Sequence, residues 1–132
     1  VDHDGWDTHF GQGPALAGQA DELARGLADF WDRLGALRER TVVVVTTEFG
    51  RRVYENASLG TDHGHGSIAM VLGPSVPGGR VVGDLPLLSE ATRVGPGDVP
   101  CVIRQRDLLA GVVKDVLGNA AGAGRIGRAL AL

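Results

Sequence analysis

The stretch TVVVVT at residues 41–46 decides the fold class of this chain. Its β-branched residues follow one another without polar alternation, which is typical of a strand covered on both faces by helices. We therefore expect a parallel strand in the centre of a sheet. The residues that follow it, TEFGRR at 47–52, would then lie at the carboxyl end of the strand, the edge where open α/β sheets usually bind ligands.

Amphipathic helices are predicted on both sides of this strand in the sequence. Apolar residues recur in alternating steps of four and three between residues 15 and 37, and a second helical pattern covers residues 106–117. Another buried strand is expected at residues 68–72, and a short one at residues 80–82 within a segment rich in proline and glycine. The order of these elements predicts an α/β fold with helices flanking a sheet.

Length and composition place the chain among globular proteins. It has 132 residues, about the size of one domain, with 43% hydrophobic and 22% charged residues. Its formal charge of -3 comes from acidic and basic residues mixed along the sequence, so no basic stripe is present to bind a nucleic acid backbone. Apolar runs such as residues 42–45 and 68–72 are far shorter than the roughly 20 residues of a membrane helix. We therefore expect neither a nucleic acid partner nor a membrane span.

The two ends of the sequence lead us to expect a single partial domain over residues 1–132. The first twelve residues are polar and punctuated by glycine, without an initiator methionine, and read as a loop that leaves a strand further upstream. Residues 119–132 are rich in small side chains and are expected to fray. The single cysteine, Cys101, excludes an internal disulfide and is expected to be a small buried residue. A partial sheet would expose apolar edges, which predicts poor solubility of the isolated chain.

Histidines and aspartates fall together in two short clusters. His9 lies two residues after Asp7, and His63 and His65 follow Asp62. In an extended segment, residues two apart point to the same side, so each cluster could present two ligand atoms to one point. Imidazole with carboxylate suits zinc, manganese or iron better than calcium, so the sequence predicts a divalent-metal site. The candidate ligands are Asp7, His9, Asp62, His63 and His65.

These residues and their neighbours also have other interpretations. Aspartate and histidine are common in turns, and Asp7 or Asp62 could cap a local backbone amide. Glu48 is a candidate metal ligand, supporting residue or general base, or else an ion-pair partner of Arg51 or Arg52. Arg51 is a candidate clamp for an anionic substrate, because a guanidinium matches phosphate or sulfate oxygens in a two-point geometry. Glu48 and Arg51 are thus the candidate catalytic residues.

Three motifs, taken in order, carry a family resemblance. They are GWDTH at residues 5–9, TEFGRRVYENASLGTDHGHG at 47–66, and GGRVVGDLP at 78–86. Together they resemble the C-terminal part of the bacterial domain-of-unknown-function family 1501, from about residue 5 to residue 117. That family is similar to the alkaline phosphatase and sulfatase superfamily. The resemblance implies an α/β fold, namely the C-terminal part of a doubly wound sheet with flanking helices.

The resemblance also implies a function. The chain would be the C-terminal fragment of a metal-dependent hydrolase that acts on small anionic phosphate or sulfate esters. Asp7 and His9 would form one ligand pair, and His63 or His65 would supply the late histidine. The superfamily has an Asp-His pair where this sequence has Glu48-Phe49. Proteins of the superfamily take their nucleophile from the N-terminal half of the domain, so we expect the isolated chain to be inactive. Similar proteins often carry an export signal, which implies an extracytoplasmic parent protein.

Two other functions are compatible with the same residues. A non-catalytic binding or structural protein could retain the hydrolase fold, since a fold alone does not imply activity. The metal-binding loops could also serve only to stabilise the fold, in which case chelation would lower the melting temperature without affecting any ester hydrolysis.

Overall fold

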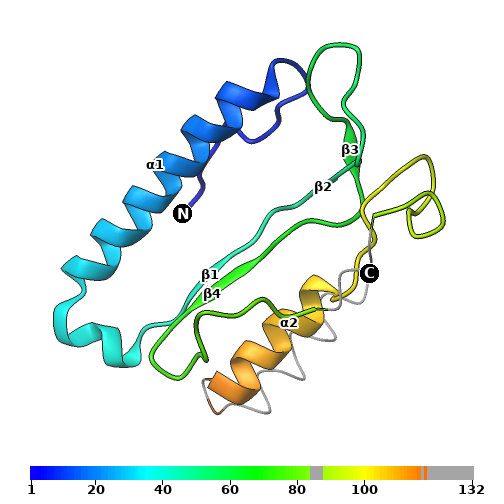
Figure 1. Cartoon of the computed structure of the whole chain (residues 1–132). Coiled ribbons are helices and arrows are strands. Elements are labelled where there is room, and N and C mark those ends of the chain that lie inside the picture. The colour runs from blue at the N-terminus through cyan, green and yellow to red at the C-terminus, as the bar shows by residue number, and fades with distance from the viewer. Residues whose placement is uncertain (84–87, 117, 119–132) are drawn as a thin grey trace.

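The computed structural model describes every residue of the chain except 84–87, 117 and 119–132 (Figure 1). The expected frayed tail therefore lies outside the described residues. The described elements are helices and short strands, which confirms the predicted α/β class in its coarse form. In chain order they are α1 (Gln12–Arg33), the 3₁₀ helix η1 (Gly35–Arg40), β1 (Val43–Val45), β2 (Gly50–Arg51), β3 (His63–Gly64), β4 (Met70–Leu72), α2 (Gln105–Gly111) and the short π-helix η2 (Val112–Val116).

The four strands form one long, irregular hairpin (Figure 1). β1 pairs with β4 in antiparallel fashion, with Val44 opposite Val71, and β2 pairs with β3, with Arg51 opposite His63. The prediction that residues 41–46 form a parallel strand is therefore wrong, because in the described part of the chain this strand pairs in antiparallel fashion. Parallel neighbours need a crossover connection of a dozen or more residues, usually a helix. Here the chain turns back between β2 and β3 through a short irregular loop, so the returning strand runs antiparallel.

The helices follow the apolar patterns of the sequence, but both patterns are interrupted. The first pattern predicted one helix over residues 15–37, whereas α1 gives way to η1 at Gly35. Gly35 has a φ of 51°, a left-handed conformation that commonly ends helices and is accessible mainly to glycine. The second predicted helix, residues 106–117, is divided between α2 and η2. As expected, none of the helices in the described part of the chain is long and apolar enough to cross a membrane.

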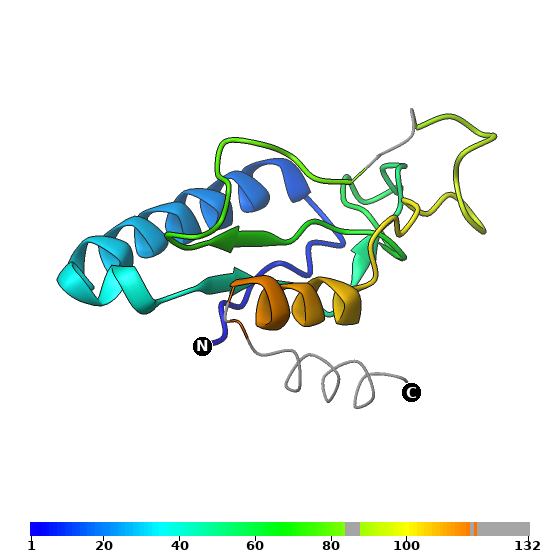
Figure 2. The same ribbon diagram turned by 90° about the horizontal axis from the view of Figure 1, so that it is seen from below.

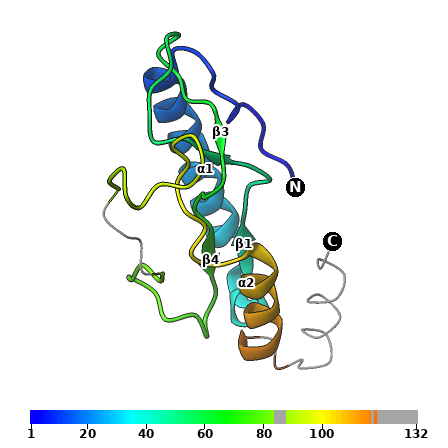
Figure 3. The ribbon, with the colours of Figure 1, turned by 90° about the vertical axis from the view of Figure 1, so that its right-hand side faces the viewer.

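The hairpin runs between the two α-helices (Figures 1 and 2). α1 lies on one side of the strands and α2 on the other. Figure 3 shows that the start of α1 and the loop between β2 and β3 lie side by side at one end of the molecule. This end is where the two histidine-containing clusters are found.

Little of the chain is buried. No described residue has a large side chain that is fully buried, and the valines of β1 are only half-buried. The expectation of strands covered on both faces is therefore not met within the described residues. Cys101 is exposed, not buried. Residues 80–82 are not a strand: no other described residue pairs with them, and Val81 is 95% exposed.

Candidate metal centre

Two segments far apart in the sequence meet beside the start of α1. The backbone N–H of Gly11 donates to the carbonyl oxygen of Ser58 at 2.9 Å, and the N–H of Thr61 donates to the carbonyl oxygen of Thr8 at 3.3 Å. These hydrogen bonds hold the GWDTH segment against the loop that leads into β3.

Gly60 and Asn56 make this close approach possible. Gly60 is buried, and a Cβ atom at this position would lie 2.2 Å from the carbonyl carbon of His9. Asn56 Oδ1 accepts the N–H groups of Ser58 at 2.9 Å and Gly60 at 3.1 Å, which is the way asparagine stabilises turns. Asn56 Nδ2 also donates to the carbonyl oxygen of His9 at 2.9 Å. One loop asparagine therefore fixes both the turn and its contact with the other segment.

Asp7, His9 and His63 form a compact cluster of possible metal ligands. His63 Nε2 lies 2.6 Å from Asp7 Oδ1, and His9 Nε2 lies 3.0 Å from the same oxygen. One ligand atom from each of the three residues lies within 4.8 Å of the others. The side chains of Asp7, His9 and His63 are 58%, 42% and 48% exposed, so the cluster is open to solvent. Within the described ranges, no other group of three or more such side chains is close enough to hold an ion.

Asp62 lies on the other side of the His9 ring. Its Oδ1 is 3.5 Å from His9 Nδ1, while Asn56 Nδ2 donates to the same oxygen at 3.1 Å and Arg52 Nη1 donates to Oδ2 at 3.3 Å. Metal-binding histidines commonly donate their second ring N–H to a carboxylate, which fixes the ring and leaves the other nitrogen free for the metal. The geometry therefore makes Asp62 a partner of His9, next to the three-residue cluster.

The surroundings of both aspartates favour their charged forms. The hydrogen bond with His63 is the main cause that lowers the pKa of Asp7 below its ordinary value; partial desolvation opposes it, and the charge of His9 adds to it. For Asp62 the main cause of the lowered pKa is the hydrogen bond from Asn56, again opposed by partial desolvation. Carboxylates must be deprotonated to bind a metal ion. Both groups are therefore in the required state at neutral pH.

Asp62 is thus beside the cluster, and two further predicted site residues, His65 and Glu48, also lie outside it. His65 follows β3 at a bend, so the alternation that would place it on the same side as His63 ends with the strand. Glu48 is exposed. In the described part of the chain, Arg51 and Arg52 form ion pairs with aspartates and none with Glu48, so the ion-pair interpretation of Glu48 is wrong. Metal binding by His65 and catalysis by Glu48 stay predictions.

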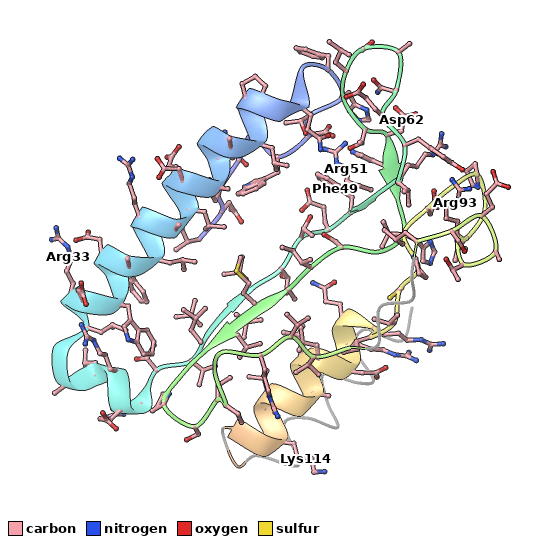
Figure 4. The ribbon with its side chains drawn as sticks, viewed as in Figure 1. Arg33, Phe49, Arg51, Asp62, Arg93 and Lys114 are labelled. Carbon is pink, nitrogen blue, oxygen red and sulfur yellow. The ribbon has the colours of Figure 1, made fainter. Side chains whose placement is uncertain are left out.

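Arg51 and Phe49 contribute contacts that the sequence analysis did not predict. The ring of Phe49 stacks on the ring of His63, with centroids 4.3 Å apart and planes 9° apart. Arg51 donates to the backbone carbonyl oxygens of Trp6 and Thr61. Figure 4 shows Arg51, Phe49 and Asp62 gathered at this end of the hairpin. The spacing of two residues between Phe49 and Arg51 is the sequence signal that could have indicated a shared face.

Comparison with known proteins gives one family. The family described as "Protein of unknown function (DUF1501)" matches residues 1–126 of the chain. No curated protein and no solved structure matches the chain. The match confirms the family that the motifs of the sequence predicted.

Proposed function

The chain belongs to this family of unknown function, and from the site itself we propose that it carries part of the divalent-metal centre of a hydrolase of phosphate or sulfate esters. The observation that carries the proposal is the cluster of Asp7, His9 and His63. One carboxylate and two imidazoles form the ligand set of several catalytic zinc sites, and the same combination holds non-haem iron. Zinc, manganese and iron are the ions that this donor set suits.

The ligand atoms are close enough for one ion. Atoms bound about 2.1 Å from one metal lie at most roughly 4.2 Å apart, and the three ligand atoms here lie within 4.8 Å of one another. The Nε2 atoms of both histidines lie next to the same carboxylate oxygen of Asp7, at 2.6 and 3.0 Å. To surround an ion, the widest separation needs to narrow by less than about 1 Å, and the direct contact between Asp7 and His63 needs to open to admit the ion.

The chain's own residues would hold and orient the centre. Asp62 fixes the His9 ring through Nδ1, and Asn56 and Arg52 in turn hold Asp62. A bound metal supplies Lewis-acid chemistry that polarises an ester oxygen and stabilises the attacking or leaving oxygen. The exposure of Asp7, His9 and His63 leaves one side of the centre accessible to a small anionic ester. The proposal assigns the nucleophile to residues outside this chain.

The proposal includes a larger fold. We place the hairpin and its two helices in the C-terminal part of a doubly wound, alkaline-phosphatase-like sheet. The half-buried valines of β1 support this placement, because such a run is normally covered on both faces. The antiparallel pairing of β1 and β4 is compatible with it, since many doubly wound sheets include an antiparallel strand.

Metal analysis of the purified protein tests the proposed ligands. Replacement of His9 or His63 by alanine should abolish stoichiometric binding of Zn²⁺ or Mn²⁺, because each removes one of three ligand atoms. His3→Ala is the matched control, since it removes a histidine that lies outside the cluster. His65→Ala tests the remaining sequence prediction, because loss of metal in this variant would add His65 to the ligands. Full metal occupancy in a His9→Ala, His63→Ala double variant would overturn the metal centre. Hydrolysis of a chromogenic aryl phosphate and aryl sulfate by the metal-loaded parent protein, which would include the residues that supply the nucleophile, then tests the activity.

A non-catalytic binding protein is the second candidate, and Phe49 favours it. This residue stands where the superfamily has a histidine, and its ring packs on His63 without offering a ligand atom. Glu48 beside it is also outside the cluster. A parent protein that binds the metal with the expected ligands, yet hydrolyses neither ester, would favour this candidate over the hydrolase.

A further inference from the structure

Arg51 connects the two segments that carry the candidate ligands. Its Nη1 donates to the carbonyl oxygen of Thr61, in the loop before β3, and its Nη2 donates to the carbonyl oxygen of Trp6 at 2.6 Å, in the GWDTH segment. The same Nη2 lies 3.4 Å from Asp7 Oδ1. A guanidinium presents its donors in a rigid planar fork, so these acceptors fix its orientation. One side chain therefore bridges two segments that lie far apart in the sequence.

Phe49 extends this bridge to His63. The Arg51 Cζ atom lies 4.8 Å from the centroid of the Phe49 ring, and that ring also stacks on the His63 ring in a nearly parallel arrangement. A cation or the edge of another ring is attracted to an aromatic face by the negative charge of that face, and stacked rings attract each other by dispersion. The three planar groups, which we call the Arg51–Phe49–His63 stack, restrict rotation of the His63 imidazole.

The pairing of β2 with β3 explains why these groups meet. Arg51 lies directly opposite His63 in the antiparallel pair. Phe49 precedes Arg51 by two residues, so in extended chain both side chains leave the same face. The TEFGR motif therefore places a guanidinium and a ring beside the histidine that the returning strand provides.

The bridge is also better shielded than the ligands that it holds. The Arg51 side chain is 20% exposed, whereas those of Asp7 and His63 are 58% and 48% exposed. Two of its terminal nitrogens are bound to the protein's own carbonyl oxygens, which leaves them less free for the anion-clamp role predicted from the sequence. An arginine in this setting acts through the residues it touches.

We propose that Arg51 is a positioning residue that, together with Phe49, holds Asp7 and His63 in the ligand geometry before the metal binds. The inference rests on the proposed metal centre and names the residue that sets its affinity. Loss of groups that orient metal ligands typically weakens binding by about 10- to 100-fold. Removing the Arg51 guanidinium should have an effect of this size although Arg51 itself offers no ligand atom.

Calorimetric titration of the metal-free protein with Zn²⁺ alone tests the inference. Arg51→Ala, Arg51→Lys and Phe49→Leu should each bind more weakly than the wild type, with Arg51→Ala weakened by about 10- to 100-fold. Arg51→Lys keeps the charge, but a single ammonium cannot reproduce the planar fork. The matched control is Arg38→Ala, because Arg38 also donates to a backbone carbonyl oxygen, that of Trp31, and to a carboxylate, Asp32 at 2.7 Å, away from the cluster.

Two further readouts separate positioning from general stability. The visible absorption of the Co²⁺-substituted protein reports the geometry around the ion, so it should change in the Arg51 variants and in Phe49→Leu but not in Arg38→Ala. Guanidinium ion, added below denaturing concentrations, should restore part of the Zn²⁺ affinity that Arg51→Ala has lost. It should leave the Zn²⁺ affinity of Arg38→Ala unchanged. If Arg51→Ala does not fold, Arg51→Lys and Phe49→Leu decide the outcome.

The possible results have distinct meanings. Wild-type affinity and an unchanged Co²⁺ spectrum in Arg51→Lys and Phe49→Leu would overturn the positioning role while leaving the metal centre intact. Absence of Zn²⁺ binding by the wild-type protein would overturn the proposed function, and the inference with it. Weaker binding in these variants, together with an unchanged Arg38→Ala, supports the inference.

Discussion

A side chain at Gly60 would separate the two segments that carry the candidate ligands. A Cβ atom there would lie 2.2 Å from the His9 carbonyl carbon and 2.4 Å from its oxygen, and neither backbone atom can move away without breaking the contact between the segments. We expect Gly60→Ala to lower the free energy of unfolding by about 1–3 kcal/mol and to weaken Zn²⁺ binding. Urea denaturation measures the first effect. Gly78→Ala is the control, since nothing lies within 4 Å of a Cβ at that position; equal midpoints for the two variants would contradict the prediction.

The charge of Asp7 predicts how stability depends on pH. Its pKa in the folded chain is lowered, chiefly by the hydrogen bond with His63, whereas the ordinary value of about 3.9 applies in the unfolded chain. The ionised carboxylate therefore stabilises the fold above that unfolded value, and the stabilisation is lost as the pH falls through the folded pKa. With a chelator present, wild type should be more stable than Asp7→Asn at neutral pH. The difference in urea midpoint should shrink below about pH 4, and a difference that grows toward acid would refute this assignment.

Residue spacing predicted part of the site, and local backbone conformation decided the rest. Asp7 and His9, two residues apart, both reach His63, although the chain between them is not extended, since the N–H of His9 donates to the carbonyl oxygen of Asp7 at 3.2 Å. His65 has the same spacing from His63 but lies at a bend directly after β3 and outside the cluster, which no residue-type preference in TDHGHG indicates. The roles of Asp62 and Arg51 depend on a contact between segments more than 40 residues apart, and sequence spacing carries no information on such contacts.

At the scale of elements, replacement by alanine should have opposite effects on stability at the glycines inside α1 and at the glycine where α1 ends. Gly18 and Gly26 lie inside the helix, and a Cβ at either position meets nothing within 4 Å. Because alanine has the higher helix propensity, Gly18→Ala and Gly26→Ala should each stabilise the chain by roughly 0.5–1 kcal/mol. Gly35→Ala should destabilise it, because Gly35 has a φ of 51°. Thermal denaturation followed by circular dichroism at 222 nm measures these changes, and stabilisation by Gly35→Ala would show that α1 continues past that residue.

Helices were easier to predict than strand pairing for a physical reason. The 3.6-residue period of α1 is a local property, so the pattern at residues 15–37 gave nearly the observed helix. The direction of β1 relative to its neighbour depends on where the chain returns. The run at residues 41–46 is compatible with either direction. The sequence also predicted a strand at residues 68–72, but nothing in it indicated that this strand pairs with β1 in antiparallel fashion.

At the scale of the whole molecule, exposed apolar side chains should dominate the behaviour of the chain when it is prepared alone. Phe30 in α1 is 47% exposed, Ile68 before β4 is 76% exposed, and no large side chain among the described residues is fully buried. Burial of apolar surface is the main favourable contribution to folding. We therefore expect the 132-residue chain to bind the dye ANS and to melt over a broad temperature range. A sharp, cooperative melt of a soluble monomer without dye binding would contradict both this expectation and the poor solubility predicted from the sequence.

Metal binding should change this behaviour, because the ligands close a long loop. Asp7 and His63 lie 56 residues apart in the sequence, and an ion held by both would stabilise only the folded arrangement. At a free Zn²⁺ concentration 100 times the dissociation constant, such linkage stabilises the fold by about 2.7 kcal/mol, which corresponds to a rise in melting temperature of roughly 10 °C for a chain of this size. His3→Ala should show the same rise as wild type, since its ring is outside the cluster, and His63→Ala should show almost none. An equal rise in the melting temperature of His63→Ala would mean that the ion binds elsewhere. A rise that occurs only when Asp7, His9 and His63 are all intact would show that these three side chains act as one site, although His63 lies far from the other two in the sequence.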